Sequence, residues 1–120
     1  MSQIDAYAGG ALARKLFWVA ALFALAMALY PHGVRLPGDP SDRIQHALAF
    51  ATLGLLGGLA YPRLSTSRLI IALALFGAFI EIAQAIPVLH RDCDFLDWLT
   101  DLAASVAAVV PLRTWLVPTR

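Results

Sequence analysis

The chain alternates long apolar stretches with short polar breaks. Four apolar stretches follow one another, over residues 16–30, 44–61, 69–89 and 95–112. A helix needs roughly 17–25 residues to cross about 30 Å of hydrocarbon, and all four stretches are near or slightly below that length. The pattern therefore predicts an all-α fold, a four-helix transmembrane bundle of short spans joined by short loops.

Turn and capping signals set the expected helix boundaries. Pro31 follows the first apolar stretch and Pro62 follows the second, as residues that end helices do. Asp39 or Ser41 suits the N-cap of the second helix, and Asp94 suits that of the fourth. These signals predict one domain over residues 1–120, with helices at roughly 14–31, 41–61, 67–88 and 94–112.

Composition supports a membrane protein. Hydrophobic residues make up 60% of the chain and charged residues 14%, against about 45–50% and about 25% in soluble domains. A soluble domain of this length buries only about two-thirds of its surface, so it could not hide so many apolar side chains. The net charge of +1 provides no basic excess for nucleic acid. The single cysteine, Cys93, excludes an intrachain disulfide and a Cys-x-x-Cys metal site.

Positive charges indicate the orientation in the membrane. With four spans, the N-terminus, the middle loop and the C-terminus share one side, which holds Arg14, Lys15, Arg63, Arg68, Arg113 and Arg120. The first and third loops hold only Arg35, Arg43 and Arg91. The positive-inside rule places both termini in the cytoplasm of a multi-pass protein of the cytoplasmic membrane. A signal peptide is the alternative for the first stretch. The segment before this stretch is long for a signal peptide, and no clean cleavage site follows Tyr30.

Four ionisable residues interrupt the later apolar stretches: His46, Glu81, Asp97 and Asp101. An ionisable group inside a membrane helix costs a few kcal/mol, so it usually faces the bundle interior and has a partner. At about 1.5 Å of rise per residue, all four lie about 4 to 12 Å below the outer surface. Their common depth on three helices predicts a polar pocket that opens outward.

Polar neighbours share helix faces with these residues. Asp42 precedes His46 by four positions and Gln84 follows Glu81 by three, spacings that place each pair on one helix face. We expect His46, Glu81 and Asp97 to supply acid/base groups. The expected binding residues are Asp42, Arg43, Gln84, Arg91 and Asp101.

Each candidate also has a purely structural interpretation. Arg43 and Arg91, at the pocket rim, either neutralise carboxylates or hold an anionic ligand by bidentate hydrogen bonds. Asp97 also suits a helix cap, and Glu81 and His46 also suit internal pairing. The sequence requires no cofactor, although one histidine with several carboxylates suits a hard divalent ion such as Mg²⁺.

A ridge of small residues follows the second helix. Gly54 and Gly58 have the Gly-x-x-x-Gly spacing that lets another helix approach closely. Its partner is either another helix of this chain or the same ridge of a second copy in a homodimer.

Three of these motifs together resemble the VanZ-like family of small integral membrane proteins. That family has Asp-Lys-x-x-His at the start of its second helix, Glu-x-x-Gln in the third, and Arg-x5-Asp-x3-Asn leading into the fourth. The matching positions here are Asp42, Arg43, His46, Glu81, Gln84, Arg91, Asp97 and Asp101. Arg43 stands where the family has Lys, Asp101 where it has Asn, and Ala104 where it has Gly.

The resemblance implies a multi-pass membrane protein of the bacterial cell envelope, since the founding member is linked to teicoplanin resistance. We expect an outward pocket that binds or modifies an anionic lipid-linked or cell-wall-related molecule and affects glycopeptide susceptibility. The alternative is a non-catalytic membrane subunit or assembly factor whose polar cluster only holds the bundle together. An ion-conducting role is disfavoured because residues 48–60 and 69–79 are almost entirely apolar.

Overall fold

The computed structural model describes residues 3–33, 38 and 41–116, and this part of the chain forms helices and no strand. The predictions for Arg35, Asp39 and Arg120 lie outside the described residues. The elements are α1 (Gln3–Leu29), α2 (Asp42–Ala60), α3 (Thr66–Gln84), the short 3-10 turn η1 (Pro87–Leu89) and α4 (Phe95–Leu116). The prediction of an all-α chain with four helices is confirmed.

Side-chain caps set the start of the three later helices. The hydroxyl of Ser41 accepts a hydrogen bond from the Ile44 amide at 3.2 Å at the start of α2. Ser65 caps α3 in the same way. Before α4, Asp94 Oδ1 accepts from the Leu96 amide at 2.9 Å. Each cap satisfies a backbone amide that has no partner within its own helix.

Three predicted boundaries are wrong. Helix α1 begins at Gln3 rather than near residue 14, because no proline interrupts the segment that precedes the apolar stretch. Helix α3 ends at Gln84 rather than at 88, since the ring of Pro87 is incompatible with the preceding helical turn and opens η1 instead. Helix α4 continues through Pro111 to Leu116, four residues beyond the predicted end.

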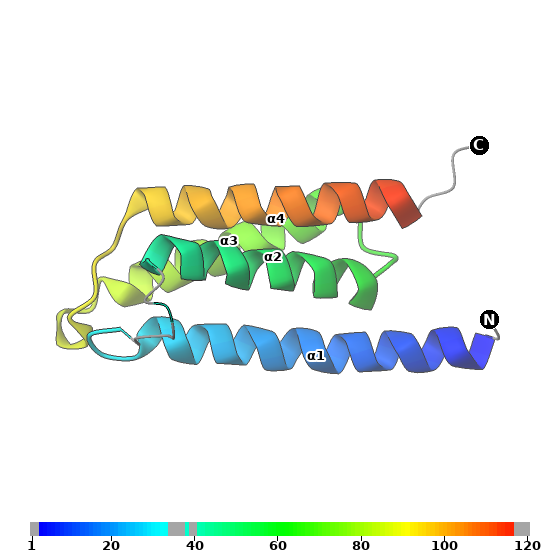
Figure 1. The fold of residues 1–120 in the computed structure, drawn as a ribbon, viewed down its shortest axis with the longest axis horizontal. Coiled ribbons are helices and arrows are strands. Elements are labelled where there is room, and N and C mark those ends of the chain that lie inside the picture. Colours follow the sequence, from blue (N-terminus) through cyan, green and yellow to red (C-terminus); the bar gives the residue numbers. More distant parts are fainter. Residues whose placement is uncertain (1–2, 34–37, 39–40, 117–120) are drawn as a thin grey trace.

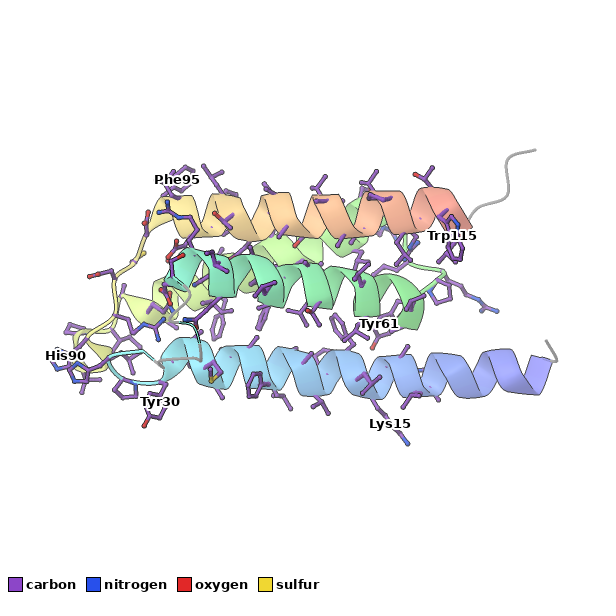
Figure 2. The ribbon with its side chains drawn as sticks, viewed as in Figure 1. Lys15, Tyr30, Tyr61, His90, Phe95 and Trp115 are labelled. Carbon is purple, nitrogen blue, oxygen red and sulfur yellow. The ribbon has the colours of Figure 1, made fainter. Side chains whose placement is uncertain are left out.

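The helices form an elongated bundle of 50 × 26 × 25 Å. Helices α2 and α3 lie between α1 on one side and α4 on the other (Figure 1). The end of α1, the start of α2, the end of α3 and the start of α4 lie at the same end of the bundle (Figure 1). Figure 2 shows Tyr30, His90 and Phe95 at this end, and Trp115 at the opposite end. We call these ends the Phe95 end and the Trp115 end.

The bundle is apolar outside and partly polar inside. Many large apolar side chains are exposed, including Leu22, Leu75 and Ile82. The buried residues combine a small apolar core with six polar side chains: His46, Glu81, Gln84, Asp97, Asp101 and Ser105. Soluble proteins seldom expose such extended apolar surfaces, whereas lipid-facing helices do.

Three helices contain segments long and apolar enough to cross a membrane: 10–29 in α1, Thr66–Gln84 and Phe95–Leu116. Helix α2 is not among them because its first two turns carry Asp42, Arg43, Gln45 and His46. Its 19 residues still extend for about 28 Å.

The glycine ridge of α2 packs inside the bundle. A Cβ atom on Gly54 would lie 3.0 Å from the Ala108 Cβ atom, and one on Gly58 would lie 2.6 Å from Leu112 Cδ2. Both glycines are buried against α4. The surface that the sequence suggested for a homodimer therefore serves a contact within this chain.

Candidate functional site

Three helices contribute ionisable side chains to one buried place near the Phe95 end. His46 of α2 is 7% exposed, Glu81 of α3 is 5% exposed, and Asp101 of α4 is fully buried. Asp97, one turn before Asp101, is buried as well. We call His46, Glu81, Asp97 and Asp101 the buried cluster.

A hydrogen bond of 2.8 Å joins His46 Nδ1 to Asp101 Oδ1. A carboxylate at this position favours the tautomer with its proton on Nδ1, which leaves Nε2 free to accept a proton or bind an ion. His46 Nε2 faces Glu81 Oε1 at 3.9 Å, which is too far for a hydrogen bond. His46 therefore lies between two carboxylates from different helices.

Backbone features bring the cluster together. Gly77 of α3 has no side chain, and a Cβ atom there would lie 2.9 Å from Asp101 Oδ2. Helices α3 and α4 can therefore approach closely at Asp101. The backbone amide of Asp94 donates to Glu81 Oε2 at 3.0 Å, which joins the segment before α4 to α3.

Two carboxylate oxygens of the cluster, Glu81 Oε1 and Asp101 Oδ2, are buried and have no hydrogen-bond partner among the described residues. A buried acceptor without a partner loses its hydration with no compensating bond, which is costly. The cluster therefore contains two strong hydrogen-bond acceptors that have no partner among the described residues.

Both rim arginines form ion pairs with carboxylates. Arg43 Nε donates to Asp97 Oδ1 at 3.2 Å, and its Nη2 donates to Asp94 Oδ2 at 2.9 Å. Arg91 Nη2 donates to Asp42 Oδ1 at 2.9 Å. Arg91 Nη1 also donates to backbone carbonyls at the end of α1. Both arginines therefore pair with carboxylates, which is one of the two roles that the sequence left open.

A polar cavity of about 570 Å³ opens beside the cluster, and we call it the mouth cavity. Its lining comprises His32, Gly33, Ser41, Asp42, Arg43, Gln45, His90, Arg91, Asp92, Asp94 and Asp97. The rings of His32 and His90 stack with centroids 4.6 Å apart. Aspartates outnumber arginines in this lining, so the cavity wall has a net negative charge.

A second cavity, the apolar groove, has a volume of about 340 Å³ and lies mainly between α1 and α2. Its apolar lining comprises Ala20, Phe23, Ala24, Met27, Ala28, Leu48, Ala49, Phe50 and Ile80. Asp42, Gln45 and Arg91 line both this groove and the mouth cavity, and His46 lines the groove. The polar and apolar spaces therefore adjoin next to the buried cluster.

One predicted site residue lies apart from the others. Gln84 is fully buried, and its Nε2 donates to the Ala28 carbonyl of α1 at 3.0 Å. It lines neither cavity and ties α3 to α1. The remaining seven predicted residues lie in the buried cluster or along the mouth cavity.

The apolar groove and the stacked histidines are absent from the sequence predictions. Ala20, Ala24 and Ala28 recur every four residues along α1, and this run of small side chains was the available signal for the groove. The sequence had no corresponding signal for the stacking of His32 on His90, because the contact joins two separate connections.

No known protein family, curated protein or solved structure matches this chain. Proposals about its function therefore rest on residue chemistry and geometry.

Proposed function

We propose that this chain is a VanZ-like integral protein of the cytoplasmic membrane that binds an anionic lipid-linked or cell-wall-related molecule. The observation that carries the proposal is the junction of the mouth cavity with the apolar groove at Asp42, Gln45 and Arg91. An amphiphile would place its headgroup in the mouth cavity and its hydrocarbon chain in the groove. Ligand sites combine apolar walls with a few convergent polar groups in this way.

The charge distribution supports an extracytoplasmic mouth. The Trp115 end carries Arg63 and Arg68, next to the connection between α2 and α3. At the Phe95 end, Arg43 and Arg91 are both paired with aspartates. Under the positive-inside rule the Trp115 end faces the cytoplasm, so the mouth cavity faces outward. In this orientation α2 is the fourth span, with Ile44, Leu48, Leu55 and Leu59 exposed along one face.

The buried cluster also suits proton transfer to a bound headgroup. Asp101 orients His46, and a histidine held by a carboxylate is a common general base. Glu81 and Asp97 provide carboxylates on neighbouring helices. Modification of the bound molecule, in addition to its binding, is therefore within the chemistry of the site.

Filling the apolar groove tests the proposal. Ala24→Phe adds a ring to the groove wall, and Leu75→Phe is the matched control because Leu75 is exposed on α3 outside both cavities. Both variants would be purified in mild detergent, and the retained lipids would be identified by mass spectrometry. We expect wild type and Leu75→Phe to retain one enriched lipid species that Ala24→Phe loses. Identical lipid profiles in all three proteins would contradict the proposal.

A non-catalytic membrane subunit is the second candidate. It is favoured by the number of polar contacts that only connect helices, such as the Gln84 contact with α1 and the indole of Trp98 donating to the Ala74 carbonyl. Co-purification with one defined partner, together with destabilisation by every cluster substitution, would favour this role over ligand binding.

A further inference from the structure

The buried cluster has an excess of negative groups. Glu81, Asp97 and Asp101 surround one histidine, and Arg43, on the half-exposed rim, contacts only Asp97 among them. Burial makes uncompensated carboxylates costly, because the protein interior screens charge poorly. A cation inside the cluster would relieve this cost.

The separation of the ligand atoms fits one ion. Nitrogen and carboxylate ligands lie about 2.0–2.2 Å from a transition metal, so two ligands of one ion are at most about 4.4 Å apart. His46 Nε2 and Glu81 Oε1 face each other at 3.9 Å, and Glu81 Oε1 is buried without a partner. The candidate ligand atoms of His46, Glu81 and Asp101 all lie within 4.8 Å of one another, as do those of Asp42, His46 and Asp97.

We infer that the buried cluster binds a divalent transition-metal ion, with His46 Nε2 and Glu81 Oε1 as ligands and with Asp97, which has a carboxylate oxygen within 4.8 Å of a ring nitrogen of His46, as the candidate third ligand. An imidazole nitrogen with two carboxylates suits Mn²⁺ or Zn²⁺. Mg²⁺ prefers oxygen ligands and retains several waters, so a buried histidine ligand disfavours it. The inferred ion therefore differs from the Mg²⁺ that the sequence suggested.

Asp101 acts as a positioning residue for His46. Metal-binding histidines usually donate their other ring N–H to a carboxylate, which fixes the orientation of the ring. The 2.8 Å bond between His46 Nδ1 and Asp101 Oδ1 has this arrangement. Asp101 in turn lies against Gly77 of α3.

The ion would lie where the two cavities adjoin, since His46 lines the apolar groove and Asp97 lines the mouth cavity. It would give the negatively charged mouth cavity a positive centre for a phosphate group. This consequence rests on the proposed function, whereas ion binding itself does not.

Metal titration in the absence of added lipid tests the ion site. The full chain in detergent would be treated with EDTA, passed through a desalting column and titrated with Mn²⁺, with free Mn²⁺ followed by electron paramagnetic resonance. We expect one saturable Mn²⁺ per chain, displaced by Zn²⁺ and not by an equal concentration of Mg²⁺. Absence of saturable Mn²⁺ and Zn²⁺ binding would overturn the proposal, and displacement by Mg²⁺ would overturn the choice of ion.

Variants locate the site. Glu81→Gln and His46→Gln should weaken Mn²⁺ binding by about a hundredfold or more. The controls are Arg63→Gln and Ser67→Ala, exposed residues outside both cavities that should leave binding unchanged. Equal losses in the control and ligand variants would overturn the assignment. If the ligand variants fail to fold, an EDTA-reversible rise in the melting temperature of wild type and Ser67→Ala with Mn²⁺ would support the site, and its absence would contradict it.

Two substitutions at Asp101 separate positioning from direct ligation. Asn keeps an oxygen that accepts from His46 Nδ1, so Asp101→Asn should bind Mn²⁺ within about tenfold of wild type. Asp101→Ala removes the acceptor and should weaken binding by about 10- to 100-fold. A loss in Asp101→Asn as large as that in Glu81→Gln would overturn the positioning role. Lipid retention with and without Mn²⁺ separately tests the proposed function.

Discussion

At the scale of single residues, the site depends on a glycine, Gly77, as much as on its charged residues. Gly77 lets Asp101 approach α3, and Asp101 then holds His46. Sequence spacing predicts that the ionisable residues face inward, because an unpartnered charge in lipid is costly. Spacing does not reveal that a glycine on another helix makes room for one of them.

Gly77→Ala should disturb this contact. The new Cβ atom would lie 2.9 Å from Asp101 Oδ2 and 3.4 Å from Phe50 Cζ, so the side chains or the helix must shift. We expect a loss of roughly 1–3 kcal/mol in unfolding free energy, typical of overpacking, with weaker Mn²⁺ binding. Thermal or denaturant unfolding in detergent measures the first effect.

The matched control is Gly10→Ala on α1, where the nearest atom to a new Cβ is the end of a flexible arginine side chain at 3.4 Å. This substitution should leave stability unchanged or raise it by about 0.5–1 kcal/mol, because alanine favours a helix over glycine. Equal stability of the two variants would contradict the proposed role of Gly77.

At the scale of elements, the hydrophobic pattern predicts the number and type of helices because each apolar stretch has a length close to that of a membrane span. The pattern fails at the start of α1 and at the ends of α3 and α4, where apolar content and helix boundaries do not coincide. The hydrophobic pattern also does not predict which residues of different helices contact each other. Arg43 and Asp97, for example, are 54 residues apart, and the sequence left both pairing and ligand binding open.

The contact between α2 and α4 gives an element-scale prediction. Gly54→Leu would insert a branched side chain where Ala108 and Val109 already pack. We expect the helices to separate and the unfolding free energy to fall by roughly 1–3 kcal/mol. Ala72→Leu, which introduces the same side chain at an exposed position of α3, should have little effect. Similar melting curves for both variants would show that the α2–α4 contact tolerates the larger residue.

At the scale of the whole molecule, exposed apolar faces and buried polar groups define a protein suited to lipid. Composition alone indicated this class, since the chain cannot hide its apolar residues in water. The adjoining cavities could not be predicted, because their walls combine residues from α1, α2, α3 and α4 and from two connections.

Orientation in the membrane can be tested with the single cysteine. Cys93 is exposed at the Phe95 end, so a membrane-impermeant maleimide added to intact cells should label it if that end faces outward. In the double variant Cys93→Ser, Ser67→Cys, the thiol lies at the start of α3 at the opposite end and should be protected until the cells are lysed. The reverse labelling pattern would show that the mouth cavity faces the cytoplasm.

The proposed cell-envelope role predicts a phenotype. If expression of the chain changes the teicoplanin susceptibility of a sensitive host, His46→Ala and Glu81→Gln should abolish that change because they alter the buried cluster. Immunoblots of isolated membranes would check that both variants insert at wild-type levels. A wild-type change in teicoplanin susceptibility with both variants would show that the function does not need the buried cluster.

The bond between the Asp94 amide and Glu81 Oε2 affects how variants at position 81 should be interpreted. One oxygen of this carboxylate anchors the polypeptide just before α4, while the other faces the imidazole of His46. A glutamine retains a carbonyl oxygen able to accept from that amide, whereas alanine removes the anchor entirely. Glu81→Ala would therefore disturb the fold and remove the reactive carboxylate at the same time. Glu81→Gln is the better test of the chemical role of the carboxylate.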